Sequence, residues 1–328
     1  MFRKLLTVSL ILGTTLLLGC SSDSGFGPVT SSDSGFGTVT SSDSVSGPVM
    51  SSGNDTDNIT PAQFKENIHS SLPDTWVTEY NTIKGKLLTI LPLYQKYYRD
   101  IVVYAWNSNV DDPYEGIEGG AYVSIENNDP TVQRMVLEIK SQEFTDSQIH
   151  RYAVISHEYF HLYQKSLNSH MNKSDDHPTS FRTKWLIEGG AATVEGIYIK
   201  QHYGISYTAE QQNNVHNDVF ELPAKFETHA ESVDIDTNYS SSIFLVLVLA
   251  KELQLSGLTE AKSFQLILRD YMMTNPNKET WKALFAETFN VTLDEFYAKL
   301  PGYVGLKNAD VLPTSTLTLE DIFSTTTL

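Results

Sequence analysis

The feature that most constrains this 328-residue chain is the stretch Ile155–Tyr163, which reads ISHEYFHLY. Residues four apart project from the same face of an α-helix, so His157 and His161 would lie side by side. Two neutral imidazoles placed in this way can bind one Zn²⁺ at roughly 2.0–2.1 Å each. Glu158 would lie slightly further round the helix, within reach of a metal-bound water molecule. Two histidines do not complete a zinc site, so a third ligand must come from elsewhere in the chain.

A candidate third ligand lies in the segment Trp185–Ala192, where Glu188 interrupts an otherwise apolar helical pattern. A buried carboxylate is costly unless it pairs with a cation or a metal ion. The small residues 189–192 would let this helix pack closely against the helix that carries the histidines. Two histidines and a glutamate, with the fourth position open for water, form a known catalytic zinc site.

The segments HEYFHLYQ and WLIEGGA together resemble the gluzincin metallopeptidases, a family that includes thermolysin-like and aminopeptidase-N-like enzymes. The resemblance implies that His157, His161 and Glu188 are the zinc ligands. It also implies that Glu158 is the general base. The recognisable similarity covers roughly residues 150–300, whereas residues 60–145 match the family only in the order of their elements.

The resemblance implies roles for two more residues. Glu195 lies two helical turns after Glu188 on the same face, where the aminopeptidase-like branch has a glutamate that hydrogen-bonds a zinc histidine. The thermolysin-like branch has an aspartate four residues after its glutamate, and this chain has Ala192 there, which favours the aminopeptidase-like branch. Tyr239, at the start of an apolar helical run, matches the tyrosine that stabilises the oxyanion in the transition state.

The function implied by the resemblance is zinc-dependent hydrolysis of a peptide or protein substrate. Zn²⁺ would lower the pKa of its bound water toward about 7, and Glu158 would take the proton as the water attacks the peptide carbonyl. The strand expected over Met135–Ile139 could pair with an extended substrate.

Several alternatives stay open. A non-catalytic lipoprotein that binds zinc or peptides with the same fold would not need Glu158. A structural zinc site would need a fourth protein ligand, and the chain has no cysteine after residue 20. Tyr239 could be a packing residue, and Glu195 could be an exposed helix carboxylate.

The segment Val123–Asn127, VSIEN, is similar to the GxMEN segment with which aminopeptidases recognise a substrate amino terminus, although its glycine and methionine are missing. The alternative interpretation is the end of a β-hairpin. If Glu126 does not serve in this way, nothing in the sequence anchors a free α-amino group, and an endopeptidase is favoured.

The hydrophobic periodicity predicts an α+β fold, with a small N-terminal mixed sheet packed on a mostly helical lobe. The resemblance implies a thermolysin-like, gluzincin catalytic domain. A helix is expected to begin at Thr60-Pro61, and a second to cover Trp76–Leu91, with its continuation to Tyr98 left open. The later strands are expected at Ile101–Trp106, Ala121–Ile125 and Met135–Ile139, and the later helices at Thr145–Leu167, Thr183–His202, Ser240–Leu255, Leu258–Met273, Lys278–Phe289 and Leu293–Leu300. Within them, Ile243–Ala250 is too short to span a membrane and is expected to be a buried core helix.

Residues 1–19 have the basic start and apolar run of a processing signal. The sequence LLGC at their end resembles a bacterial lipobox, which implies a lipid anchor on Cys20, the only cysteine of the chain. Ser21 then implies sorting to the outer membrane. An uncleaved membrane anchor and an ordinary secretory signal are the alternatives. Residues 20–58 contain three imperfect ten-residue repeats and predict a flexible tether, followed by a metallopeptidase-like domain at 59–305 and a C-terminal tail at 306–328.

The net charge of the chain limits the classes of partner that it can be expected to bind. The chain has 23 basic and 40 acidic side chains and a formal net charge of −17. Nucleic-acid partners are met by basic patches, so we expect no nucleic-acid partner. We expect a zinc metallopeptidase that is held at the bacterial cell envelope by its lipidated cysteine.

Overall fold

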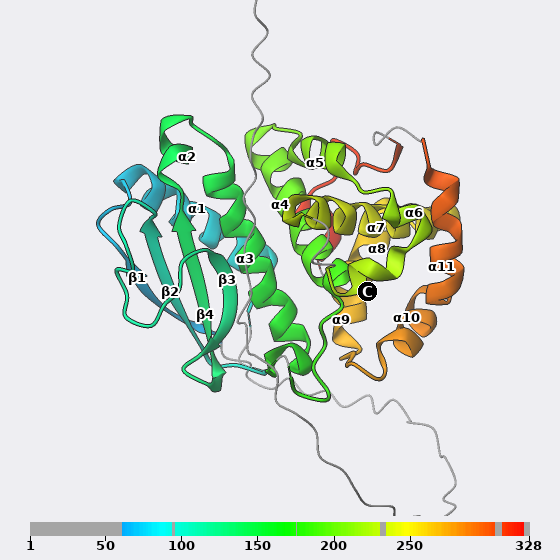
Figure 1. Ribbon diagram of the computed structural model, residues 1–328, viewed down its shortest axis with the longest axis horizontal. Helices are drawn as coiled ribbons and strands as arrows, with labels where there is room; N and C mark the ends of the chain where they lie inside the picture. The colour runs from blue at the N-terminus through cyan, green and yellow to red at the C-terminus, as the bar shows by residue number, and fades with distance from the viewer. Residues whose placement is uncertain (1–60, 94–95, 175, 230–233, 306–309, 325–328) are drawn as a thin grey trace, which may run out of the picture.

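The computed structural model describes residues 61–93, 96–174, 176–229, 234–305 and 310–324. The predicted processing signal, Cys20 and the tether lie outside these residues. The described residues form a small sheet and a larger helical lobe, and the helix α3 (His150–Leu167) runs between the two (Figure 1). The prediction of an α+β fold is thereby confirmed.

The element bounds are as follows. The strands are β1 (Gln63–Ile68), β2 (Asp100–Asn107), β3 (Ala121–Glu126) and β4 (Asp129–Ile139). The other helices are α1 (Asp74–Ile90), α2 (Ser141–Thr145), α4 (Lys184–Tyr203), α5 (Tyr207–Gln211), α6 (Asp218–Glu221), α7 (Ile235–Leu255), α8 (Glu260–Gln265), α9 (Tyr271–Met273), α10 (Trp281–Phe289), α11 (Leu293–Lys299) and α12 (Leu319–Phe323). A single π-helical turn, Leu266–Asp270, joins α8 to α9.

The sheet is mixed, with the strand order β1-β2-β4-β3. Strands β1 and β4 run parallel to β2, whereas β3 runs antiparallel to β4 and forms one edge. Successive side chains of a strand face opposite sides, so Ile101, Val103 and Ala105 are buried in the main core with the helices. On the opposite face, Trp106 and Val136 belong to a separate, smaller apolar cluster.

The N-terminal region corrects one prediction and decides one point that the sequence left open. The segment after Thr60-Pro61 is strand β1 and not a helix, because its backbone pairs in parallel with β2 from Gln63 onward. Helix α1 ends at Ile90 and does not continue to Tyr98. Pro92 gives the local reason, since a proline disfavours helical backbone at the residue before it.

Strand β4 is longer than predicted, and its place in the sheet decides whether it can pair with a substrate. The turn between β3 and β4 consists of Asn127 and Asn128, both with positive φ, so Asp129 and Pro130 already belong to β4. Strand β4 lies between β2 and β3, and both of its edges are paired. The predicted pairing of Met135–Ile139 with an extended substrate is therefore wrong, because the backbone groups that it needs are already bonded within the sheet.

The helical lobe follows the predicted order with local differences. The helix predicted over Thr145–Leu167 begins five residues later, as α3 at His150, and Thr145 instead ends the separate short helix α2. Between the two helices, Ser147 has a positive φ of 52°. Helix α7 begins five residues earlier than predicted, and Asp234 caps it by accepting a hydrogen bond from the Thr237 N–H at 3.0 Å. The run Ile243–Ala250 is fully buried, as predicted for a core helix. No helix of the described residues is both long and apolar enough to cross a bilayer.

The segment predicted as a C-terminal tail contributes to the core in its described part. Leu319 and Ile322 of α12 have no exposed surface, and the Phe323 ring packs against Phe160 and Tyr163 of α3. The alternation of buried and exposed residues in this short helix was too brief to stand out in the sequence. The folded unit therefore extends beyond the predicted boundary at residue 305.

Candidate metal centre

Three ligand-type side chains meet where α3 packs on α4. The two Nε2 atoms of His157 and His161, one turn apart on α3, lie 3.1 Å from each other. Glu188, in the second turn of α4, places its Oε2 3.1 Å from Nε2 of His161 and 3.5 Å from Nε2 of His157. All three residues are buried. The three residues predicted as zinc ligands are thus brought together, although they come from two helices.

The triangle of donor atoms fits a metal ion. Ligands at roughly 2.0–2.1 Å from a tetrahedral ion lie about 3.3 Å from one another, which matches the separations of these atoms. Imidazole nitrogen and carboxylate oxygen are ordinary ligands of zinc. Within the described residues, this is the group of histidine and acidic side chains that could hold a metal ion.

Each histidine is oriented through its other ring nitrogen. Nδ1 of His157 donates to Oε2 of Glu195 at 2.9 Å, so the residue predicted as an outer partner is in contact with the predicted ligand. Nδ1 of His161 donates to Oε1 of Gln164 at 2.8 Å, and Nε2 of Gln164 donates to the Ile187 carbonyl of α4 at 3.0 Å. Since both Nδ1 atoms carry the proton, both Nε2 atoms are presented to the site.

Gln164 was missed in the sequence. Its spacing of three residues from His161 could have identified it, because residues three apart are neighbours on a helix. Its amide group ties α3 to α4, since it forms hydrogen bonds with both His161 and the backbone of α4.

Helix α7 closes another side of the site. The ring centroid of Tyr239 lies 5.8 Å from that of His157, in an edge-to-face arrangement. Helix α4 approaches α7 so closely that a Cβ on Gly189 would lie 2.3 Å from the Ser242 carbonyl oxygen. The absence of a side chain at Gly189 thus permits the close approach of α4 and α7, which brings Glu188 and Tyr239 to the same site.

Glu158, the predicted general base, is buried and adjoins His157 on α3. Its negative charge contributes to the raised pKa of His157. A buried carboxylate beside a metal site can accept a proton from a molecule bound there, because it is held close and is shielded from bulk water.

The electrostatics of the three ligand-type residues favour one anion and one cation. Burial would raise the pKa of the Glu188 carboxyl, but Lys184 and His161 outweigh it and hold that pKa well below its ordinary value. Burial would lower the pKa of His157, but hydrogen bonds to Glu188 and Glu195 raise it well above its ordinary value. These contacts therefore favour the protonated form of His157, whereas a bound metal ion would require the deprotonated Nε2.

Two further residues near the site, Lys184 and His229, are not among those predicted from the sequence. Nζ of Lys184 lies 3.2 Å from Oε1 of Glu188. His229 Nε2 lies 2.8 Å from the Ser242 Oγ, and its ring centroid is 5.6 Å from that of Tyr239. Burial lowers the pKa of His229 to about 4, so this side chain is neutral at pH 7. No local sequence pattern marks His229, because it belongs to the loop region before α7.

Glu126 is committed to another set of contacts. Its carboxylate forms an ion pair with Arg134 of β4 and accepts a hydrogen bond from the Tyr104 hydroxyl at 3.2 Å. These partners belong to the sheet and not to the metal-site helices. Arg134 thus pairs with the carboxylate of Glu126, the residue that the sequence suggested as an anchor for a substrate amino terminus.

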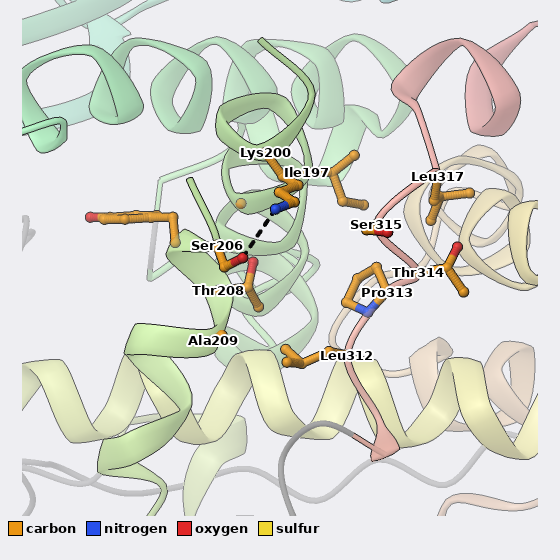
Figure 2. Close-up of a pocket in the computed structure, with 12 residues that line it drawn as sticks. Ile197, Lys200, Ser206, Thr208, Ala209, Leu312, Pro313, Thr314, Ser315 and Leu317 are labelled. Carbon is orange, nitrogen blue, oxygen red and sulfur yellow. Dashed lines mark hydrogen bonds between the residues drawn. The ribbon is translucent and has the colours of Figure 1, made fainter. Parts of the chain in front are cut away.

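A cavity of about 120 Å³ lies away from this centre, between the second half of α4, helix α5 and the segment 312–317 (Figure 2). Its wall is mainly apolar, and Lys200 reaches across one side to donate to the Ser206 Oγ at 3.2 Å (Figure 2). None of the residues of the candidate metal centre lines it. The cavity is therefore not part of that centre.

No protein-family profile, curated protein or solved structure matches this chain. The geometry of the site and the chemistry of its residues therefore provide the basis for a functional assignment.

Proposed function

We propose that this protein is a zinc-dependent metallopeptidase with a thermolysin-like, gluzincin catalytic domain. The observation that carries the proposal is the triangle of His157, His161 and Glu188, whose donor atoms lie 3.1–3.5 Å apart with Glu158 buried next to it. When bound there, Zn²⁺ would lower the pKa of a coordinated water molecule and polarise the substrate carbonyl.

The chain's own residues then have separate tasks. Glu158 accepts the proton of the attacking water and passes it to the leaving amine. Glu195 and Gln164 keep the two imidazoles in the tautomer that presents Nε2. Tyr239 donates a hydrogen bond from its hydroxyl to the oxyanion that develops on the carbonyl oxygen.

The position of β3 at the edge of the sheet favours a peptide as the substrate. It is the outer strand of the sheet on the side that packs near α3, so its unpaired backbone edge can bond an extended peptide. This assigns to β3 the role that the sequence had suggested for part of β4. Since Arg134 occupies Glu126, we propose cleavage of internal peptide bonds rather than removal of N-terminal residues.

The test combines metal stoichiometry with cleavage of a peptide library by the wild type and by Glu158→Gln. We expect one zinc ion per chain in both proteins, and a loss of activity of roughly a hundredfold or more in the variant, the range typical of a general base. The variant should keep its zinc because Glu158 is not a ligand. Equal cleavage by the two proteins, or cleavage by a wild type freed of metal, would contradict the mechanism. Zinc binding without cleavage in the wild type would favour a non-catalytic zinc- or peptide-binding protein.

A further inference from the structure

The two carboxylate oxygens of Glu188 face different partners. Oε2 points to the two histidines, whereas Oε1 lies 3.2 Å from Nζ of Lys184, one turn earlier on α4. Lys184 is the first residue of α4, and its side chain keeps 29% of its surface exposed. A single carboxylate thus lies between a lysine cation and the proposed metal position.

Helix stability does not account for Lys184 at this place. The N-terminus of a helix carries partial positive charge, so a lysine in the first turn is unfavourable. The order in which the lysine precedes the glutamate by four residues is also the weaker one for an ion pair along a helix. Lys184 therefore opposes the local preferences of α4 and lies instead against a residue of the metal centre.

We propose that Lys184 is a positioning residue that restricts Glu188 to one-oxygen ligation of the metal ion. The inference rests on the proposed function, since it concerns the same site. By holding Oε1, Lys184 leaves Oε2 as the ligand and keeps a coordination position open for water and substrate. Its positive charge also repels the metal ion and draws electron density from the carboxylate, so the site binds the metal less tightly and leaves it a stronger Lewis acid.

The experiment compares Lys184→Met, which removes the charge but keeps the length of the side chain, with Lys184→Arg, which keeps a cation. Lys200→Met is the matched control, because it removes the same charge from the last turn of α4, away from the metal centre. Zinc affinity is measured on the full chain by competition with a chromogenic chelator. The visible absorption of the Co²⁺-substituted proteins reports the number of ligands.

We expect Lys184→Met to bind Zn²⁺ on the order of tenfold more tightly, because a nearby repelling charge is gone. Its Co²⁺ absorption should weaken, as expected when the second carboxylate oxygen adds a ligand to a tetrahedral site. Lys184→Arg and Lys200→Met should resemble the wild type in both measurements. Thermal melts of the metal-free proteins confirm that each variant is folded.

Different results would overturn the role of Lys184 and the proposed function. A wild type that binds metal, together with a Lys184→Met protein of unchanged or weaker affinity and an unchanged Co²⁺ spectrum, overturns the role of Lys184 alone. A wild type that binds neither Zn²⁺ nor Co²⁺ overturns the proposed function and this inference with it.

Discussion

At the scale of single residues, a proton and the proposed metal ion would compete for the same nitrogen atom of His157. The Nε2 atoms of His157 and His161 lie 3.1 Å apart, and neither histidine can turn away because Glu195 and Gln164 hold the opposite nitrogens. The raised pKa of His157 means that its neighbours favour the protonated imidazole when no metal ion is bound. Since the ligand must lose that proton, metal affinity should fall as the pH is lowered.

His229 provides a prediction about stability and pH. Its pKa is lowered by burial to about 4 in the folded protein, whereas the ordinary value is 6.5. Between these values the unfolded chain binds more protons than the folded chain, so this group destabilises the fold as the pH falls. We expect the metal-free wild type to lose about 2 kcal/mol more stability than His229→Gln between about pH 7 and about pH 5, measured by urea unfolding.

Ser242→Ala serves as the control for this comparison. It removes the hydroxyl that His229 contacts but leaves the imidazole buried, so the protein should keep most of the pH dependence. Parallel losses of stability in the wild type and His229→Gln would show that burial does not hold the imidazole neutral.

At the scale of elements, the contact between α4 and α7 sets the width of the site. A Cβ at position 189 would lie 2.3 Å from a backbone oxygen of α7, and a backbone atom cannot move aside without moving its helix. We expect Gly189→Ala to lower the free energy of unfolding by about 2–3 kcal/mol, the upper part of the range of about 1–3 kcal/mol for overpacked cores, because the clash is with backbone. The proposed peptidase activity should fall as well, because Glu188 and Tyr239 are carried on the two helices that would separate. Urea unfolding and cleavage assays measure these effects.

The next glycine gives a matched control. A Cβ on Gly190 would lie 3.3 Å from Nε2 of Gln164 and 3.4 Å from Cδ2 of Leu268, both near the ends of side chains. Alanine also gains roughly 1 kcal/mol over glycine in a helix interior. Gly190→Ala should therefore change stability by less than Gly189→Ala, and a reversed order would contradict the role assigned to the close approach.

At the scale of the whole molecule, the sheet and the lobe are joined through the helix that carries the histidines. Helix α3 has β3, β4 and α1 on one side and α4 on the other, and Phe323 of α12 packs against it as well. The centre is thus formed in the interior of one folded unit, which the sequence predicts to be tethered at its N-terminus.

The proposed anchor is tested on intact bacterial cells that express the full chain. Cells grown with a fatty-acid analogue should incorporate it into the wild-type protein and not into Cys20→Ser. The wild type should sediment with outer membranes, whereas the variant should appear in soluble fractions, because lipid chains and not an apolar helix would hold it. Membrane association of Cys20→Ser equal to that of the wild type would exclude lipidation as the anchor.

Local sequence patterns determined much of the fold and the three residues that could bind a metal ion, His157, His161 and Glu188. The spacing of His157 and His161 required only a helix, and helical periodicity is visible over short distances in a sequence. Glu188 was identifiable because a lone carboxylate in an apolar run needs a partner. The positions of β2, β3 and α4 followed from similar short-range signals.

Tertiary structure decided the features that depend on residues distant in the chain. Strand β1 exists because its backbone pairs with β2, and α12 is core because its apolar side packs on α3; neither partner is visible locally. The same holds for His229, which is placed by burial and by contacts across the fold. By itself, the sequence determined which side chains could hold a metal ion. Only the packing of α3, α4 and α7 decided that these atoms meet within 3.5 Å, since that distance depends on how closely helices from different parts of the chain approach.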